Sequence, residues 1–353
     1  SFKLKKWLAL GGFRPRKPSM NKPKPTKHSN VVFNQLCKLI PVGMVRNLAS
    51  EYGVDKKCRT FSAWSHVVSL LYAQLTHSIG LNDVCDALRH HSAKLFAIRG
   101  ATPPSRNGLS NANKTRDADM MEALFWKMLT HLQHQFPQFG PAGSYSKLPR
   151  RFKKAIYSID SSTITLVANC MDWAKHRRRK AAAKLHLRLN LQTFLPSFAV
   201  IEEGSHHDSS RMMVLCAGLQ AGEIAVFDKA YVHFKHLFSL TEMGVLWVTR
   251  AKDNMCYHVC KKRKASGNIV RDDEITLKTK SSKEHYPQRM RRVVARVEVN
   301  GKFVEMVFIT NNMDWAASSV CDLYQSRWAI EVFFKQIKQT LQICDFLGHS
   351  KQA

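Results

Sequence analysis

The spacing of apolar side chains divides the chain into two parts. In the first part, apolar residues recur every three or four positions, as in 31–40, 61–72 and 120–129. This period is typical of amphipathic helices that bury one face against their neighbours. We therefore predict an all-helical N-terminal domain over residues 30–145.

The second part begins with short apolar runs of the kind that form strands. Strands are predicted at 155–160, 184–191, 196–201 and 223–228, with a helix at 210–219 before the last of them. Three strands, a helix and a strand follow one another in this way in ribonuclease-H-like folds. We therefore predict an α/β fold with a ribonuclease-H-like core.

More alternating segments follow the fourth strand. They lie at 245–249, 255–259, 269–278, 292–299 and 303–310, and an apolar helical pattern covers 316–341. We expect a β-rich insertion at about 240–312 that leads into one long helix. The second domain then spans residues 146–353.

The net charge of the chain indicates which class of molecule it binds. Lys and Arg number 55 against 26 Asp and Glu, and the formal net charge is +29. Such an excess indicates a polyanion such as nucleic acid, because basic contacts to phosphates release counterions. A ribosomal or membrane-surface protein is the alternative, but no long basic amphipathic helix favours a membrane.

Residues 1–29 are basic, rich in proline and free of acids, and predict a disordered arm that either touches DNA or has no role.

Cysteine usage and hydropathy indicate the compartment. The nine cysteines are scattered without a C-x-x-C pair, which is typical of reduced thiols in a cytoplasmic protein. The run Cys256-Tyr-His258-Val-Cys260 resembles a metal cluster, but no second ligand pair has zinc-like spacing. No apolar run reaches the ~20 residues of a membrane span. We expect a cytoplasmic protein without a membrane partner.

Three acidic residues stand in apolar surroundings. Asp160 and Asp228 each end a predicted apolar strand, and Glu331 interrupts the apolar run 328–334. A buried carboxylate must be paired or bound to metal, because a bare buried charge is costly. Taken singly, each Asp could be an ordinary turn residue, and Glu331 could pair with Lys335 one helical turn later.

One spacing pattern links Glu331 to three further residues. Tyr324, Arg327, Glu331 and Lys338 form the pattern Y-x2-R-x3-E-x6-K. Offsets of three, four and seven place all four on one face of a helix. That face combines an aromatic ring, a guanidinium, a carboxylate and an ammonium, which suits a DNA backbone lying across a metal site.

With this helix signature, the chain resembles the DDE transposases of the insertion-sequence-four family. Five shorter segments are similar to motifs of that family: 158–163, 184–187, 207–208, 226–231 and 248–252. The resemblance covers roughly residues 30–350. It implies metal-dependent cleavage of DNA at the ends of an insertion sequence, followed by strand transfer of the freed 3′-OH into target DNA.

The resemblance also implies roles for individual residues. The metal-binding catalytic triad would be Asp160, Asp228 and Glu331, holding Mg2+, for which Mn2+ can substitute. Tyr324, Arg327 and Lys338 would contact DNA at the transposon end. Arg250 and Lys252 are either phosphate contacts or part of a solvated basic turn.

Family resemblance further implies a dimer that pairs two terminal inverted repeats of double-stranded DNA, with the helical domain binding the ends. Such an enzyme works in the bacterial cytoplasm, at the nucleoid.

The chain departs from the family pattern at three places. Lys229-Ala230 replaces Arg-Gly after the second Asp, and His233 stands where an acid is usual, which leaves its role open. The chain stops at Ala353, where relatives continue with further helices, so we expect a shortened copy. Two alternatives therefore stay open: an inactive or truncated DNA-binding remnant, and a ribonuclease-H-like nuclease that cuts without joining.

Overall fold

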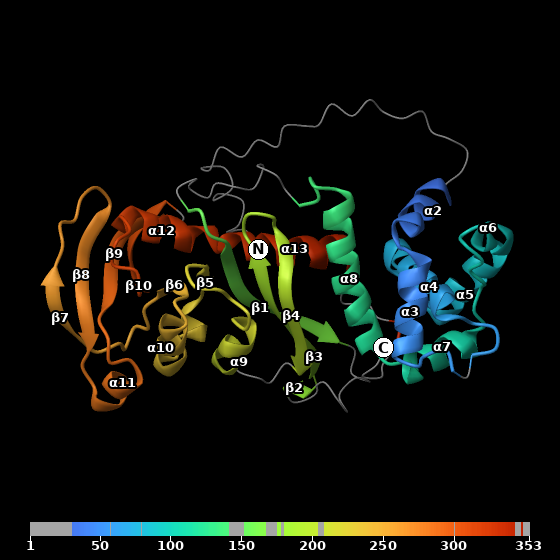
Figure 1. Cartoon of the computed structure of the whole chain (residues 1–353), viewed down its shortest axis with the longest axis horizontal. Coiled ribbons are helices and arrows are strands. Elements are labelled where there is room, and N and C mark those ends of the chain that lie inside the picture. Colours follow the sequence, from blue (N-terminus) through green and yellow to red (C-terminus); the bar gives the residue numbers. More distant parts are fainter. Residues whose placement is uncertain are drawn as a thin grey trace, which may run out of the picture.

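The computed structural model describes residues 30–56, 58–78, 80–140, 152–166, 175–177, 180–203, 208–299, 301–342 and 347–348. It shows a cluster of helices followed by one large sheet with helices on both faces (Figure 1). The basic segment 1–29 lies outside the described residues, as does His207 of the 207–208 motif.

The first part of the chain is helical, as predicted. Its helices are α2 (Asn30–Leu39), α3 (Val42–Glu51), α4 (Ala63–Thr76), α5 (Leu81–His90), α6 (Ser92–Phe96), α7 (Arg106–Thr115) and α8 (Asp119–Gln135). They bury one apolar core whose most enclosed side chains include Val45, Leu48 and Leu109. Ser62 caps α4 by accepting a hydrogen bond from the Ser65 amide, so this helix begins where its sequence provides a cap.

The second part forms one ten-stranded sheet. Its strands are β1 (Ile156–Leu166), β2 (Lys175–Arg177), β3 (Lys180–Asn190), β4 (Leu195–Glu203), β5 (Ile224–Phe227), β6 (Leu246–Arg250), β7 (Tyr257–Lys262), β8 (Ile269–Leu277), β9 (Met290–Val299) and β10 (Lys302–Thr310). They are ordered β2-β3-β1-β5-β6-β10-β9-β8-β7, and β4 also pairs with β3. The predicted strands are therefore present, with the short β2 as an addition.

Helices cover both faces of the sheet. The 3-10 helix η2 (Lys229–Tyr231), α9 (Asp208–Leu215), α10 (Phe234–Glu242) and α11 (Lys280–His285) lie on one side, and α12 (Ala317–Ser326) and α13 (Trp328–Thr340) lie on the other (Figure 1). Alternate strand residues fill two separate cores, with Ile159 and Phe227 in one and Ile156 and Val226 in the other. Burial on both faces explains why these strands read as continuous apolar runs.

The central strands run side by side in one direction. β1 pairs with β5 in parallel, and β5 pairs with β6 in parallel, whereas β3 is antiparallel to both β1 and β4. Although 245–249 was expected within an insertion, β6 is thus a neighbour of β5. β10, β9, β8 and β7 then continue the same sheet through antiparallel pairs.

Two local expectations were wrong. Asp160 does not end its strand, because β1 continues to Leu166 and pairs with β3 along its whole second half. The predicted helix 316–341 is interrupted at Arg327, where the Arg327 amide bonds to the Tyr324 carbonyl and the Ile330 amide to the Arg327 carbonyl, at 3.1 Å each. These three-residue steps tighten the chain into a 3-10 turn between α12 and α13.

Of the helices in the described ranges, none has the length and apolar character needed to span a bilayer.

Candidate active site

Asp160 and Asp228 lie on adjacent parallel strands at the same level. Ile159 of β1 is in register with Phe227 of β5, so the next residue of each strand is an Asp on the face covered by α12 and α13. The Asp160 Oδ1 accepts a 2.8 Å hydrogen bond from the Ser161 amide. Asp228 instead begins η2, and its side chain accepts from the Ala230 amide. A backbone amide of β1 therefore fixes Asp160, and a backbone amide of η2 fixes Asp228 directly after the adjacent strand β5.

Glu331 reaches the same place from the helical layer. It lies in the first turn of α13, directly after the break at Arg327. The buried Ser158 hydroxyl of β1 donates a 3.3 Å hydrogen bond to the Arg327 carbonyl and so attaches the break to the sheet. The expected alternative partner of Glu331 was Lys335, but the structure pairs Glu331 with Arg327.

A single guanidinium joins the three acids. Arg327 Nη1 lies 2.8 Å from Asp160 Oδ2, and Nη2 lies 2.5 Å from Glu331 Oε1 and 4.0 Å from Asp228 Oδ2. The arginine is only 7% exposed. The structure thus brings the three predicted acids around one buried positive charge.

Burial controls the protonation of Asp160. It raises the pKa of this carboxyl to about 6, and the charges of Glu331 and Asp228 act in the same direction. The Arg327 charge and the Ser161 amide oppose the shift without cancelling it. A partly buried acid with a raised pKa beside two other acids is a typical setting for bound cations.

The donor set fits a hard divalent cation. Carboxylate oxygens are the ligands that Mg2+ prefers, and separate structural elements supply them here. Within the ranges that the structure describes, no three acidic, histidine or cysteine side chains are close enough to hold one ion. At this site the Arg327 guanidinium lies between the acids.

Two other predicted site residues, Tyr324 and Arg250, lie beside this centre. The Tyr324 ring stacks against Phe308 and lies 5.6 Å from the Arg327 guanidinium. Burial raises the pKa of Tyr324, and the charges of Arg327 and Arg250 oppose that shift, which places Arg250 within electrostatic reach. Arg250 ends β6 and is half-buried, whereas Lys252 is exposed in the turn that follows.

Lys338 lies at the far end of α13. Its Nζ donates a 2.6 Å hydrogen bond to the Thr163 carbonyl of β1, and burial lowers its pKa. The amine therefore links α13 to the same strand that carries Asp160. Three helical turns of α13 keep it away from the Arg327 guanidinium.

Lys229 and His233, which follow Asp228 in the sequence, both contact other side chains of the protein. Lys229 pairs with Asp253 at 2.8 Å. His233 begins α10, and its ring centroid lies 4.4 Å from that of His236 and 6.1 Å from that of His285. Burial is the largest cause that lowers the pKa of His233, and the charges of the His236 and His285 imidazoles lower it further.

A buried polar network supports the Asp228 turn from the opposite face of the sheet. The fully buried His186 lies 3.0 Å from Glu202 and 3.4 Å from the Tyr231 hydroxyl, and Glu202 also pairs with Arg211 at 2.6 Å. Sequence reasoning did not identify Glu202, Arg211 or Ser158. Polar residues inside otherwise apolar strands were the available signal for Ser158 and Glu202.

Comparison with known proteins shows the family of the chain. Residues 151–353 match the family model described as "Transposase DDE domain", and residues 28–98 match a "Domain of unknown function (DUF4372)". The chain is 32% identical over 334 residues to the "Probable transposase for insertion sequence element IS5377" of Geobacillus stearothermophilus, covering 93% of this chain and 81% of that protein. It is 27% identical over 217 residues to the "Putative transposase y4zB" of Sinorhizobium fredii, covering 60% of each.

Among solved structures, an endonuclease V from Streptomyces avermitilis matches 54% of this chain and 84% of its own, at 12% identity and a TM-score of 0.27. The family match covers more than half of the chain, and the Geobacillus relative covers nearly all of it. The chain therefore belongs to the DDE transposase family and is a DNA transposase.

Proposed function

We propose that Asp160, Asp228 and Glu331 are the three acids that give this transposase its divalent metal ions, Mg2+ or Mn2+. The single observation that carries the assignment is their convergence on Arg327 from β1, β5 and α13. When bound, the ions supply activation of the attacking oxygen and stabilisation of the leaving oxygen in each in-line displacement.

The strand arrangement supports a ribonuclease-H-like core. In the order β4-β3-β1-β5-β6, the first three strands are antiparallel to one another in succession, and β5 and β6 continue the sheet parallel to β1. Asp160 lies on β1, and Asp228 directly follows β5. In this proposal β6 is the last core strand. The β-rich insertion is then β7 to β10, which begins after Arg250, later than the expected boundary near 240.

The protein residues around the acids would orient DNA. We infer that Arg327 moves from Asp160 to a phosphate of the transposon end, to which a guanidinium can donate two hydrogen bonds. Tyr324, Arg250, Lys252 and Lys338 would hold the neighbouring backbone. The helices α2–α8 would bind the end sequence, and two protomers would pair two inverted repeats before attack on target DNA.

The cellular setting follows from the substrate. The relatives from Geobacillus stearothermophilus and Sinorhizobium fredii are bacterial proteins, and bacterial DNA lies in the nucleoid. We infer that the enzyme acts there, in the cytoplasm.

An assay with the element's own end DNA tests the proposal. Purified protein, Mg2+ and a labelled end duplex are incubated with a target plasmid, beside Asp160→Ala and Glu331→Ala. We expect end-specific cleavage and joined products from the wild type and neither from the variants. Cleavage without joining would support a nuclease instead, and binding without cleavage in all three proteins would support an inactive DNA-binding remnant.

A further inference from the structure

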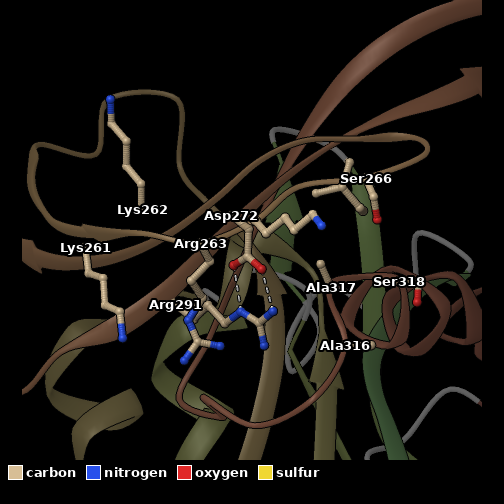
Figure 2. A pocket seen from close by; sticks show the side chains of 11 residues that line it. Lys261, Lys262, Arg263, Ser266, Asp272, Arg291, Ala316, Ala317 and Ser318 are labelled. Atoms are coloured by element: carbon tan, nitrogen blue, oxygen red, sulfur yellow. Dashed lines mark hydrogen bonds and ion pairs between the residues drawn. The ribbon is translucent and has the colours of Figure 1, made fainter.

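A cavity of about 590 Å3 opens beside the start of α12, outside the carboxylate site. One wall comes from the end of β7 and the start of β8, and the other from the first turn of α12 (Figure 2). Its charged lining residues are Lys261, Lys262, Arg263, Lys264, Arg291 and Asp272. The described lining therefore contains five bases and one acid, and the Lys262 side chain extends away from that acid (Figure 2).

The only acid that lines the described cavity is already neutralised. Arg291 donates to both carboxylate oxygens of Asp272, at 2.8 and 2.7 Å, and both side chains are buried (Figure 2). Beside the cavity, Glu274 pairs with Arg263 at 3.1 Å and lies 3.8 Å from Lys261. Asp272 and Glu274 are thus both neutralised by ion pairs with the nearest bases.

Positive charge is left over at the rim. Lys262 and Lys264 are exposed, and in the described parts of the chain no carboxylate forms an ion pair with either. Each of these ammonium groups attracts an anion that approaches the rim. The cavity is therefore ready to accept a negatively charged group.

The start of α12 adds donors to the same space. Arg291 and Arg263 donate to the carbonyls of Trp315 and Met313, which fixes the loop before the helix. The N-cap Ala316 provides no side-chain hydrogen bond, and the first turn contains no acid. The first-turn residues line the cavity, so the positive end of the helix faces it, and the one acid of the described lining, Asp272, is already paired with Arg291.

We propose that this cavity binds a phosphate of the DNA backbone, on the duplex that is cleaved at the carboxylates. This inference rests on the proposed function. α12 connects the two places, because its first turn lines the cavity and its last turn carries Tyr324 at the acids. Ten helical residues span about 15 Å. At about 3.4 Å per nucleotide, the bound phosphate lies about four or five base pairs from the cleaved bond.

Salt-dependent DNA binding tests the site. A 30-bp duplex of arbitrary sequence is titrated with wild type and with Lys262→Ala/Lys264→Ala at several salt concentrations. We expect the variant to bind on the order of tenfold more weakly at 0.1 M salt, and the slope of log affinity against log salt to fall by about one, because one phosphate contact is lost. The matched control is Lys280→Ala/Lys283→Ala, which removes two exposed lysines of α11, on the opposite face of the sheet.

A measurement on the unaltered protein makes the test independent of folding in the variants. Acetylation of Lys262 and Lys264 by a small amine-reactive reagent is followed by mass spectrometry, with and without the duplex. Protection of these two lysines, with Lys280 unprotected, supports the site. Equal salt slopes in the two double variants, or equal protection at all these lysines, would overturn it. Cleavage of the element's end by the wild type is scored separately. A wild type that shows the lysine-dependent salt slope but no end cleavage would count against the proposed function alone.

Discussion

Arg327 and Asp160 are 167 positions apart in the sequence, and yet Nη1 of the arginine lies 2.8 Å from Oδ2 of the aspartate. The contact joins the break between α12 and α13 to the middle of β1. The same guanidinium also approaches Glu331 and Asp228. One internal cation therefore compensates three acids in the free protein, and its removal should be felt by each of them.

Arg327→Gln should make the free protein a better metal binder. The guanidinium lies among the acids and repels a divalent ion, whereas Gln removes the charge. We expect roughly tenfold tighter Mn2+ binding by titration calorimetry, and a lower unfolding midpoint in EDTA because the acids lose their counter-ion. Arg89→Gln, which removes an exposed guanidinium of α5, should change neither quantity. Unchanged or weaker Mn2+ affinity would show that Arg327 does not compete with the metal.

Asp160 should make the free protein less stable as the pH rises from about 4 to about 6. Burial raises its folded pKa from 3.8 to about 6. Between these values the folded state keeps a proton that the unfolded state has released, so this stabilisation is complete at low pH and is lost as pH rises through the folded pKa. Relative to Asp160→Asn, the wild-type free energy of unfolding should fall by about 3 kcal/mol across this window. Urea titrations in EDTA measure it, and a pH-independent difference would contradict the raised pKa.

Ser158→Ala should weaken the connection between the sheet and the helix break. The hydroxyl donates to the Arg327 carbonyl in a fully buried position, and its loss should cost about 1 kcal/mol of unfolding free energy. We also expect slower end cleavage, because the Arg327–Glu331 turn is less firmly held. Ser162→Ala, on the same strand, is the control. If both variants unfold at the same urea concentration and cleave equally, the hydroxyl has no positioning role.

Lys338→Gln should weaken DNA binding without affecting sequence preference. The amine lies beside Thr163 at the end of α13, and as a phosphate contact it would contribute about one to the salt slope. Filter binding with the element's end and with an unrelated duplex measures both effects. Lys302→Gln, at the exposed start of β10, should retain the wild-type slope. An unaltered slope in Lys338→Gln would limit this lysine to holding α13 on β1.

Much of the fold could be predicted because its signals are local. Helical spacing identified α2, α4 and α8 but not α3, α6 or α7, and apolar alternation located β3 and β6 to β10 within a few residues. The alternation could not say which strands are neighbours. The parallel pairing of β6 with β5 depends on contacts between distant segments, so 245–249 was assigned to an insertion rather than to the central sheet.

In the site, too, local spacing could be predicted but contacts between distant segments could not. The spacing of Tyr324, Arg327, Glu331 and Lys338 assumes a continuous helix, and the structure breaks it at Arg327. The break is held by Ser158, a residue of another element, which no helical period reveals. The ion pairs of Arg327 with acids of β1 and β5 were equally invisible, because the resemblance implied a DNA contact and not an internal partner.

Metal-specific rescue tests the assignment of the acids most directly. A thiolate binds Mg2+ poorly and accepts softer metal ions such as Mn2+ more readily. We predict that Asp228→Cys fails to cleave the element's end with Mg2+ and regains cleavage with Mn2+. Asp253→Cys, whose aspartate pairs with Lys229 outside the acid group, should cleave equally with both ions. Wild-type cleavage by Asp228→Cys in Mg2+ would contradict the role of Asp228 as a metal ligand.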